Sequence, residues 1–456
     1  MINGRLLIDF GSTFTKAVFV DLEKNEILAR ATHYSTVDTD INDGLDACLA
    51  SISNDVGMVD LNTDEALACS SAAGGLRMVC VGFVPDYSME AANLAALGAG
   101  AKVIACYSYQ LTGSEAEEIE QLRPDIILLT GGTDGGNKKV IIHNAGMIAS
   151  QQIPHSSIIV AGNKCAVDDI RQIFKAFGER VFYCANVMPE VGRIDVDDCN
   201  RLIREIFINN IIEAKGIGKA RRKIKNVLMP TPLAVLKATR FLVDGCEEEK
   251  GLGEMIVVDL GGATTDVHSV ALFRSSPGVV VRIGLPEPYE KRTVEGDLGL
   301  KYNLEHLAKL LQEKEPQTDV AGIVMKFRKD GFIPLKDEEI QWHTRLSRLA
   351  VETAVSRHVG RIEIKYGPGG EVLLQHGKDF RHIKAVIGTG GPIVFSKEPV
   401  KILGSAVFME NEPLVLKPRA PKFYLDEHYI LFAGGLLGQE NPAKALKFMK
   451  KHLKEL

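Results

Sequence analysis

Two short segments of the chain combine acidic, glycine and hydroxyl residues in a spacing that could bind a phosphorylated ligand. They run from Asp9 to Lys16 and from Asp259 to Asp266. In each segment an apolar strand ends in Asp, a glycine follows two residues later, and a second apolar strand begins at once, which predicts a tight hairpin. Glycine permits positive φ and leaves space beside the backbone, so the N–H groups of such a turn can converge on an anion.

The side chains of the two hairpins suggest different tasks. The residues expected to bind phosphate through amide, hydroxyl or ammonium groups are Gly11, Ser12, Thr13, Thr15, Lys16, Gly261, Gly262, Ala263, Thr264 and Thr265. The carboxylates of Asp9, Asp259 and Asp266 would repel phosphate, unless Mg²⁺ lies between them, held by Asp9 and Asp259 through water. Two facing hairpins of this kind would hold a nucleotide polyphosphate, although each hairpin alone could also be an ordinary turn.

A third glycine-rich segment follows the apolar run 385–387. It consists of Gly388, Thr389, Gly390, Gly391 and Pro392. A strand that ends in glycines lets a flat ring lie against the backbone, so we expect this segment to contact the base of a nucleotide. The run 430–437 has the same design and predicts another strand that ends in glycines, before a helix that begins near Asn441.

The secondary-structure elements expected around these segments follow two patterns. Residues 5–31 alternate short apolar runs with turns, which favours an antiparallel meander, and a helix is expected near 45–52. From 78 to 212, strand-like and helix-like stretches alternate, which indicates a parallel sheet covered on both faces. From 226 the first of the two patterns resumes, and residues 258–265 copy the pattern of 8–15, which indicates a duplicated unit. We therefore predict two related α/β halves with an α/β domain inserted in the first.

The composition is typical of a globular protein and excludes several classes. The 456 residues contain 54 Lys and Arg against 59 Asp and Glu, so a broadly basic nucleic-acid binder is not indicated. No apolar run approaches the ~18 residues of a membrane span, and the first residues lack the plan of a signal peptide. The eight cysteines and eleven histidines show no metal-site spacing. We expect a cytoplasmic protein with reduced thiols, and a solvated connection at 219–225.

Taken in order, these segments resemble the actin, Hsp70 and sugar-kinase superfamily. The two Asp hairpins are similar to its phosphate loops and residues 388–392 to its adenosine loop. Residues 227–232 and 433–435 are similar to its two interdomain connecting elements. The resemblance implies two ribonuclease-H-like halves with ATP and Mg²⁺ in the cleft between them, where Asp9, Asp259 and Asp266 would organise the metal and the attacking water. The expected boundaries are 1–75 for the first part of ATPase domain I, 76–225 for the insertion, 226–254 for the connecting helix and return to domain I, and 255–456 for domain II with a C-terminal return.

One position departs from the superfamily pattern. Relatives of the chaperone type have a catalytic carboxylate just before the proline of the first connecting helix, whereas this chain has Met229 before Pro230. A thioether cannot act as a general base. We therefore expect slow ATP hydrolysis, with ATP acting as a conformational switch.

A narrower resemblance covers nearly the whole chain. Residues 229–232, the run 257–267 and the large early insertion resemble the glutamate mutase accessory family, of MutL or GlmL type. Members of this family are regarded as reactivating factors for adenosylcobalamin-dependent mutases. The resemblance implies an ATP-dependent, chaperone-like partner of mutase subunits that releases damaged cobalamin, and a homodimer is also considered. A small-molecule kinase of the same superfamily remains the alternative, followed by an electron-donating dehydratase activator and a filament protein.

The insertion carries a glycine-rich loop of its own at 129–136. Ligands of open parallel sheets bind at the carboxyl ends of the strands, so this loop is either a binding loop or a simple turn. The domain also resembles the flavodoxin-type sheet that carries cobalamin in glutamate mutase. It lacks the Asp-x-His-x-x-Gly motif, because Ile141 takes the place of Asp before His143. We therefore favour mimicry: the insertion would compete for the docking surface of the cobalamin subunit.

Overall fold

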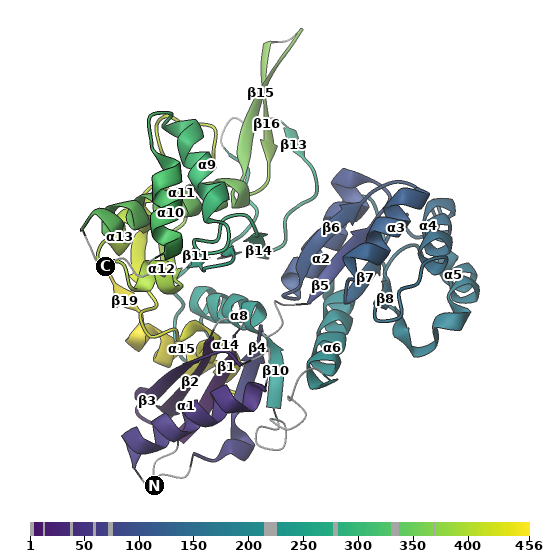
Figure 1. Ribbon diagram of the computed structural model, residues 1–456. Helices are drawn as coiled ribbons and strands as arrows, with labels where there is room; N and C mark the ends of the chain where they lie inside the picture. The colour runs from purple at the N-terminus through teal and green to yellow at the C-terminus, as the bar shows by residue number, and fades with distance from the viewer. Residues whose placement is uncertain are drawn as a thin grey trace. The chain divides into compact units, whose positions relative to one another are not determined.

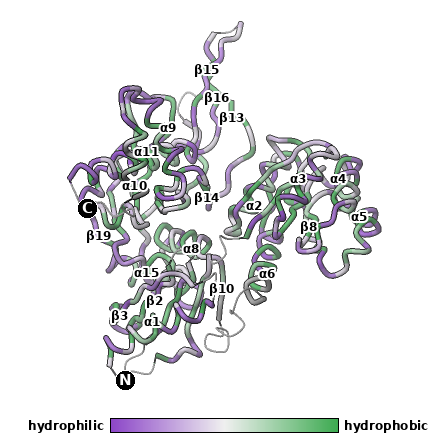
Figure 2. Tube along the Cα trace, in the orientation of Figure 1, coloured by the Kyte–Doolittle hydropathy of each residue, from purple (hydrophilic) through white to green (hydrophobic). Residues whose placement is uncertain are grey.

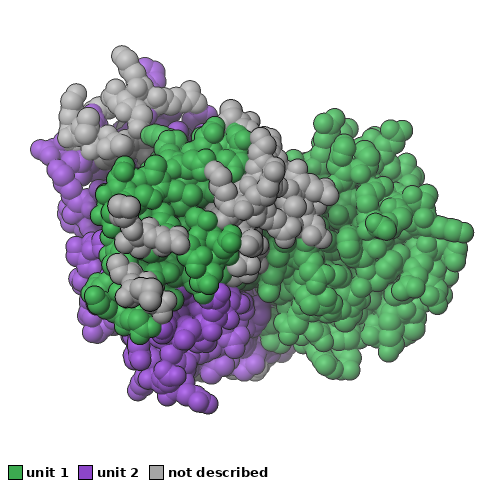
Figure 3. Space-filling view, turned by 90° about the horizontal axis from the view of Figure 1, so that it is seen from below, with its two compact units in different colours: residues 1–234, 284–286 green, residues 235–283, 287–456 purple. Residues whose placement is uncertain are grey.

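The computed structural model describes residues 4–11, 14–36, 40–57, 61–71, 76–213, 226–276, 281–329, 337–368 and 370–456 (Figure 1). The chain forms two compact units, drawn in different colours in Figure 3. Unit 1 comprises residues 1–234 and 284–286, and unit 2 comprises residues 235–283 and 287–456. The basic segment 219–225 lies outside the described residues.

The first sheet of unit 1 begins with the meander that the sequence predicts. Its strands are β1 (Gly4–Phe10), β2 (Phe14–Asp21), β3 (Glu26–Tyr34), β4 (Leu67–Ser70) and β10 (Asn226–Pro230). The order is β10-β4-β1-β2-β3, with β1, β2 and β3 antiparallel and with β4 and β10 parallel to β1. Helix α1 (Ile41–Val56) is longer than expected because Asp40 caps it by accepting from the amide of Asn42.

The main sheet of unit 2 repeats this topology. Its strands are β11 (Met255–Leu260), β12 (Thr265–Val270), β14 (Glu290–Glu295), β17 (Ala385–Thr389), β18 (Lys422–Leu425) and β19 (Lys454–Glu455). The order is β14-β12-β11-β17-β18-β19. Three antiparallel strands are again followed by two strands, β17 and β18, that run parallel to the central strand β11, and β19 is antiparallel to β18. Both units therefore contain a ribonuclease-H-like sheet, and the predicted duplication is confirmed.

The other elements of unit 2 cover this sheet or extend from it. Its helices are α9 (Leu304–Lys314), α10 (Val320–Lys329), α11 (Asp337–His358), α12 (Gly391–Val394), α13 (Pro399–Leu403), α14 (Leu431–Leu437) and α15 (Pro442–His452), with a short 3₁₀ turn at Gly404–Ala406. A smaller sheet has the order β13 (Val281–Ile283), β16 (Gly370–His376) and β15 (Arg361–Gly367). The last two strands form a hairpin that projects from the unit (Figure 1). The chain passes from unit 1 to unit 2 within α8 (Thr231–Asp244).

One predicted element is wrong. Residues 431–437, expected as a strand that ends in glycines, form helix α14. Asp426 caps this helix by accepting from the amides of Ile430 at 2.7 Å and Leu431 at 3.3 Å. A short apolar run has no periodicity that separates a buried strand from a buried helix, so the cap decides.

The inserted domain is an open parallel sheet, as predicted. Its strands are β5 (Arg77–Val81), β6 (Lys102–Tyr107), β7 (Ile126–Leu129), β8 (Ser157–Val160) and β9 (Val181–Tyr183), in the order β6-β5-β7-β8-β9. This is the flavodoxin-like order. The helices are α2 (Glu90–Gly98), α3 (Gly113–Leu122), α4 (Lys139–Ala149), α5 (Val167–Ile173) and α6 (Asp197–Glu213). Hydrophobic residues cover both faces of the sheet, and Figure 2 shows them as frequent along α2.

Buried histidines should make the stability of unit 2 depend on pH. His343 on α11 is 5% exposed, and burial lowers its pKa from 6.5 to about 4. The unfolded chain therefore binds a proton below pH 6.5 that the folded chain does not bind until about pH 4. We expect stability to be complete above pH 6.5 and to fall as the pH drops toward 4.

Urea unfolding at a series of pH values measures this effect. His343→Leu should make the decline in the free energy of unfolding smaller, by up to about 3 kcal/mol between pH 6.5 and pH 4. His155→Leu, at an exposed position, serves as the control and should retain the full decline. An equally steep decline in both variants would show that His343 does not carry the effect.

Candidate functional site

The first Asp hairpin is closed by a backbone hydrogen bond. The amide of Gly11 donates to the carbonyl of Phe14 at 3.0 Å, and a Cβ at Gly11 would lie 2.4 Å from that oxygen. Glycine is therefore required at this position. Asp9 and Lys16 are paired across β1 and β2. The predicted residues Ser12 and Thr13 lie outside the described residues.

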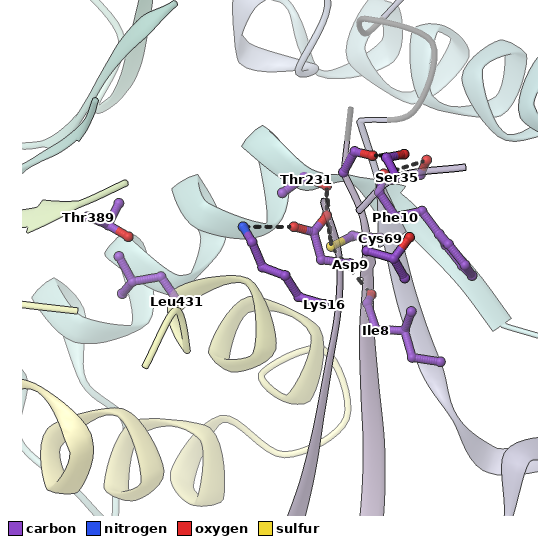
Figure 4. Close-up of polar contacts among 12 residues, drawn as sticks. Ile8, Asp9, Phe10, Lys16, Ser35, Cys69, Thr231, Thr389 and Leu431 are labelled. Atoms are coloured by element: carbon purple, nitrogen blue, oxygen red, sulfur yellow. Dashed lines mark hydrogen bonds and ion pairs between the residues drawn. The ribbon is translucent and has the colours of Figure 1, made fainter. Parts of the chain in front are cut away.

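The carboxylate of Asp9 is buried and has several partners (Figure 4). Its Oδ1 accepts from Oγ1 of Thr231 at 2.5 Å and from Sγ of Cys69 at 3.7 Å, and its Oδ2 lies 3.5 Å from Nζ of Lys16. Burial and the charge of Asp9 raise the pKa of the Cys69 thiol, so Cys69 stays a neutral donor. Thr231 is the first residue of α8 and joins the hairpin to that helix.

Thr15 lies on the opposite face of β2 from Lys16. Its side chain is buried, and a Cβ at Gly44 of α1 would lie 3.1 Å from its Oγ1. Within the described part of the chain, this hydroxyl has no hydrogen-bond partner. The structure therefore brings Lys16, but not Thr15, together with Asp9.

The second Asp hairpin has the same turn as the first. The amide of Gly261 donates to the carbonyl of Thr264 at 2.9 Å. The carbonyls of Gly261, Gly262 and Ala263 accept from residues 300–303, at distances between 2.7 and 3.1 Å. The amides of Gly262, Ala263 and Thr264 find no acceptor anywhere in the described ranges. Successive amides without acceptors are what an anion-binding turn requires.

The hydroxyl residues of this hairpin differ in orientation. Thr264 donates to Oδ2 of Asp266 at 3.0 Å, whereas Thr265 is buried and donates to the carbonyl of Leu298 at 2.7 Å. Oδ1 of Asp266 accepts from Nε of Arg292 at 2.9 Å and from Nη2 at 2.6 Å. Nothing in the sequence singles out Arg292, because its position depends on the register between β12 and β14.

The predicted adenosine loop packs directly on the second hairpin. Thr389 is paired with Asp259 between β17 and β11. Gly390 has φ of +89°, and a Cβ there would lie 2.1 Å from the carbonyl oxygen of Leu260 and 2.8 Å from Oδ1 of Asp259. Only glycine fits, and the loop therefore lies against the end of β11. Gly391 and Pro392 begin α12.

Asp426 is a further residue that the sequence does not reveal. Besides capping α14, its Oδ2 accepts from Oγ1 of Thr389 at 3.2 Å. The residue is 1% exposed and connects the adenosine loop to α14. An Asp before an apolar run is a cap signal only if the run is known to be a helix.

The glycine-rich loop of the inserted domain is filled by its own chain. A Cβ at Gly132 would lie 2.1 Å from the carbonyl oxygen of Asn137, and one at Gly162 would lie 2.4 Å from Ile141. Asn163 accepts from the amide of Gly135 and donates to the carbonyls of Gly136 and Asn137. These contacts favour the interpretation as a turn. His143, on α4, lies 3.0 Å from the carbonyl oxygen of Leu111 through Nε2.

The described ranges contain no group of three or more His, Cys, Asp or Glu side chains that could hold a metal ion. They also contain no helix of the length and apolarity needed to cross a membrane.

Two ribonuclease-H-like sheets of the same topology, with a flavodoxin-like domain inserted in the first unit, define a duplicated α/β protein. Residues 5–453 match the family model described as MutL protein, and the chain belongs to this family. It is 46% identical to Protein MutL of Clostridium tetanomorphum over 459 residues, which cover 98% of each chain.

Solved structures are similar at a lower level. Gluconate kinase from Lactobacillus acidophilus has a TM-score of 0.37 at 10% identity and covers 99% of this chain and 92% of its own. A short-chain flavodoxin associated with a bacterial microcompartment has a TM-score of 0.24 at 16% identity, covering 30% of this chain and 98% of its own.

The contact between Thr231 and Asp9 should contribute to stability. Thr231→Val removes the hydroxyl that donates to a buried carboxylate, and we expect the free energy of unfolding to fall by about 1–3 kcal/mol. Denaturant unfolding measures the change. Thr231→Ser keeps the donor and should recover at least half of the loss. Equal losses in both variants would show that methyl packing, rather than the hydrogen bond, is responsible.

Proposed function

We propose that this chain binds Mg–ATP and serves as an ATP-dependent reactivating factor for an adenosylcobalamin-dependent mutase, glutamate mutase or a related aminomutase. The observation that carries the nucleotide part is the turn at 262–264, whose amides have no acceptor within the described residues, with the 388–392 loop packed beside it. Membership of the MutL family and the resemblance to the glutamate mutase accessory family support the mutase part.

The residues present suit magnesium. Carboxylate oxygens are hard ligands of the kind that Mg²⁺ prefers, usually through retained water. Asp9 and Asp259 each lie at the end of a central strand next to a glycine turn, and they would hold the ion in this way. When bound, the ion would neutralise phosphate charge. The chain's own part is to bind the triphosphate through amides and Lys16 and to fix the nucleoside against 388–392.

The connecting helix α8 offers a route from nucleotide to partner affinity. Thr231 binds Asp9 in unit 1, and the same helix continues into unit 2 from Val235. A ligand that changes the contacts of Asp9 would therefore bias the start of this helix. Couplings between two binding sites are typically about 1–3 kcal/mol, which corresponds to roughly 5–150-fold in affinity. This range would allow a factor to bind and leave a mutase in response to ATP.

The inserted domain would then act as a mimic of the cobalamin carrier. It has the flavodoxin-like strand order, while contacts within the chain occupy its glycine loop. Such a domain can present the outer surface of a cobalamin subunit without holding the cofactor. We infer that it competes with that subunit for the rest of the mutase. Displacement of the full-length chain from the mutase by isolated cobalamin subunit would support this inference.

Calorimetry with Mg–ATP tests the nucleotide part. Asp259→Asn should weaken binding by about tenfold or more, which is 1.4 kcal/mol, because a ligand of the ion loses its charge. Asp168→Asn, an exposed Asp on α5, is the matched control and should bind as the unchanged chain does. Absence of heat from any adenine nucleotide would end the proposal.

Recovery of mutase turnover tests the proposed role as an ATP-dependent reactivating factor. Glutamate mutase carrying damaged cobalamin should regain turnover on addition of this chain, Mg–ATP and fresh adenosylcobalamin, and should not regain it when ATP is left out. Recovery that is the same with and without Mg–ATP would contradict an ATP-driven factor. ATP turnover that depends on an added small alcohol or sugar would instead indicate a kinase.

A further inference from the structure

Arg292 and Asp266 form a buried ion pair at the second Asp hairpin. The side chains are 5% and 13% exposed, and both hydrogen bonds from the guanidinium go to Oδ1 of the carboxylate. Oδ2 accepts from Thr264, the residue that ends the glycine turn. Asp266 is thus hydrogen-bonded by Arg292 at one oxygen and by Thr264 at the other. Thr264 belongs to the turn at 262–264, whose amides we assign to phosphate binding.

The register of the sheet places this pair. Arg292 on β14 lies opposite His268 on β12, and Asp266 is two residues before His268 on the same face. Burial and the neighbouring Arg292 lower the pKa of His268 to about 3, so this imidazole stays neutral. The charge of Asp266 is therefore balanced by Arg292 and not by His268.

These contacts restrict what Asp266 can do. A carboxylate has roughly four lone-pair positions, of which three are used here. Asp266 therefore has about one lone-pair position left with which to accept a hydrogen bond from a water molecule, and its orientation is fixed by the other three contacts. At the other expected position of a carboxylate, before Pro230, the chain has Met229, which is buried.

We propose that Arg292 is a positioning residue that slows ATP hydrolysis by holding Asp266, so that the chain keeps ATP bound for longer. The inference rests on the proposed function, because it concerns the rate at which the same nucleotide is consumed. It assigns to Arg292 an effect on kcat and little effect on ATP affinity. If the ion pair were purely structural, its loss would lower stability and leave kcat unchanged.

The test measures phosphate release, Mg–ATP affinity and thermal unfolding for the full chain. Arg292→Gln should raise kcat about tenfold, which is 1.4 kcal/mol of activation free energy, with an ATP dissociation constant within about threefold of the unchanged chain. Arg292→Lys keeps the charge with fewer donors and should give a smaller rise. Adding Asp266→Asn to Arg292→Gln should remove the gain, because Arg292 acts through Asp266.

Arg381→Gln is the matched control. Arg381 binds Asp379 in unit 2 through Nε and Nη2, as Arg292 binds Asp266, but it lies outside the nucleotide loops. This variant should leave kcat unchanged. A folded Arg292 variant that binds ATP and turns it over at the same rate or more slowly would overturn the proposal, and the Lys variant decides if the Gln variant does not fold. Failure of the unchanged chain to bind ATP would instead count against the proposed function.

Discussion

The arrangement of the candidate site depends on a hydrogen bond that closes a very short turn. In both halves the glycine after Asp-x donates its amide to the carbonyl three residues later, at Phe14 and at Thr264. This bond forces the chain to reverse at the end of a central strand. It therefore fixes a carboxylate at the end of that strand. In the second half it also leaves the intervening amides without acceptors in the described ranges.

Buried carboxylates connect these turns to other elements. A buried charge is costly unless it is paired and hydrogen-bonded, so each Asp at the site needs partners from elsewhere in the fold. Asp9 has Thr231 of α8, Asp266 has Arg292 of β14, and Asp426 has the amides at the start of α14. Because these partners belong to different elements, a ligand that alters one carboxylate will act on the element that holds it.

Glycine-rich loops of similar composition have different hydrogen-bonding environments in this chain. In the turn at 261–264, the carbonyls of 261–263 accept hydrogen bonds from residues 300–303, and the amides of 262–264 have no acceptor in the described ranges. At 131–136 the same residue type allows the loop to fold tightly on itself, with Asn163 hydrogen-bonded to its backbone. Composition cannot separate the two cases, because the difference lies in which neighbouring atoms reach the loop.

The sequence by itself determined the duplicated hairpins, the parallel insertion and the resemblance to a family, because these features depend on residues close together along the chain. It did not distinguish strand from helix at 431–437, where an apolar run has no useful period and only the cap from Asp426 decides. It also gave no sign that Thr15 faces α1 or that Arg292 reaches Asp266. Those facts depend on strand register and on contacts between distant segments, which only the tertiary structure decides.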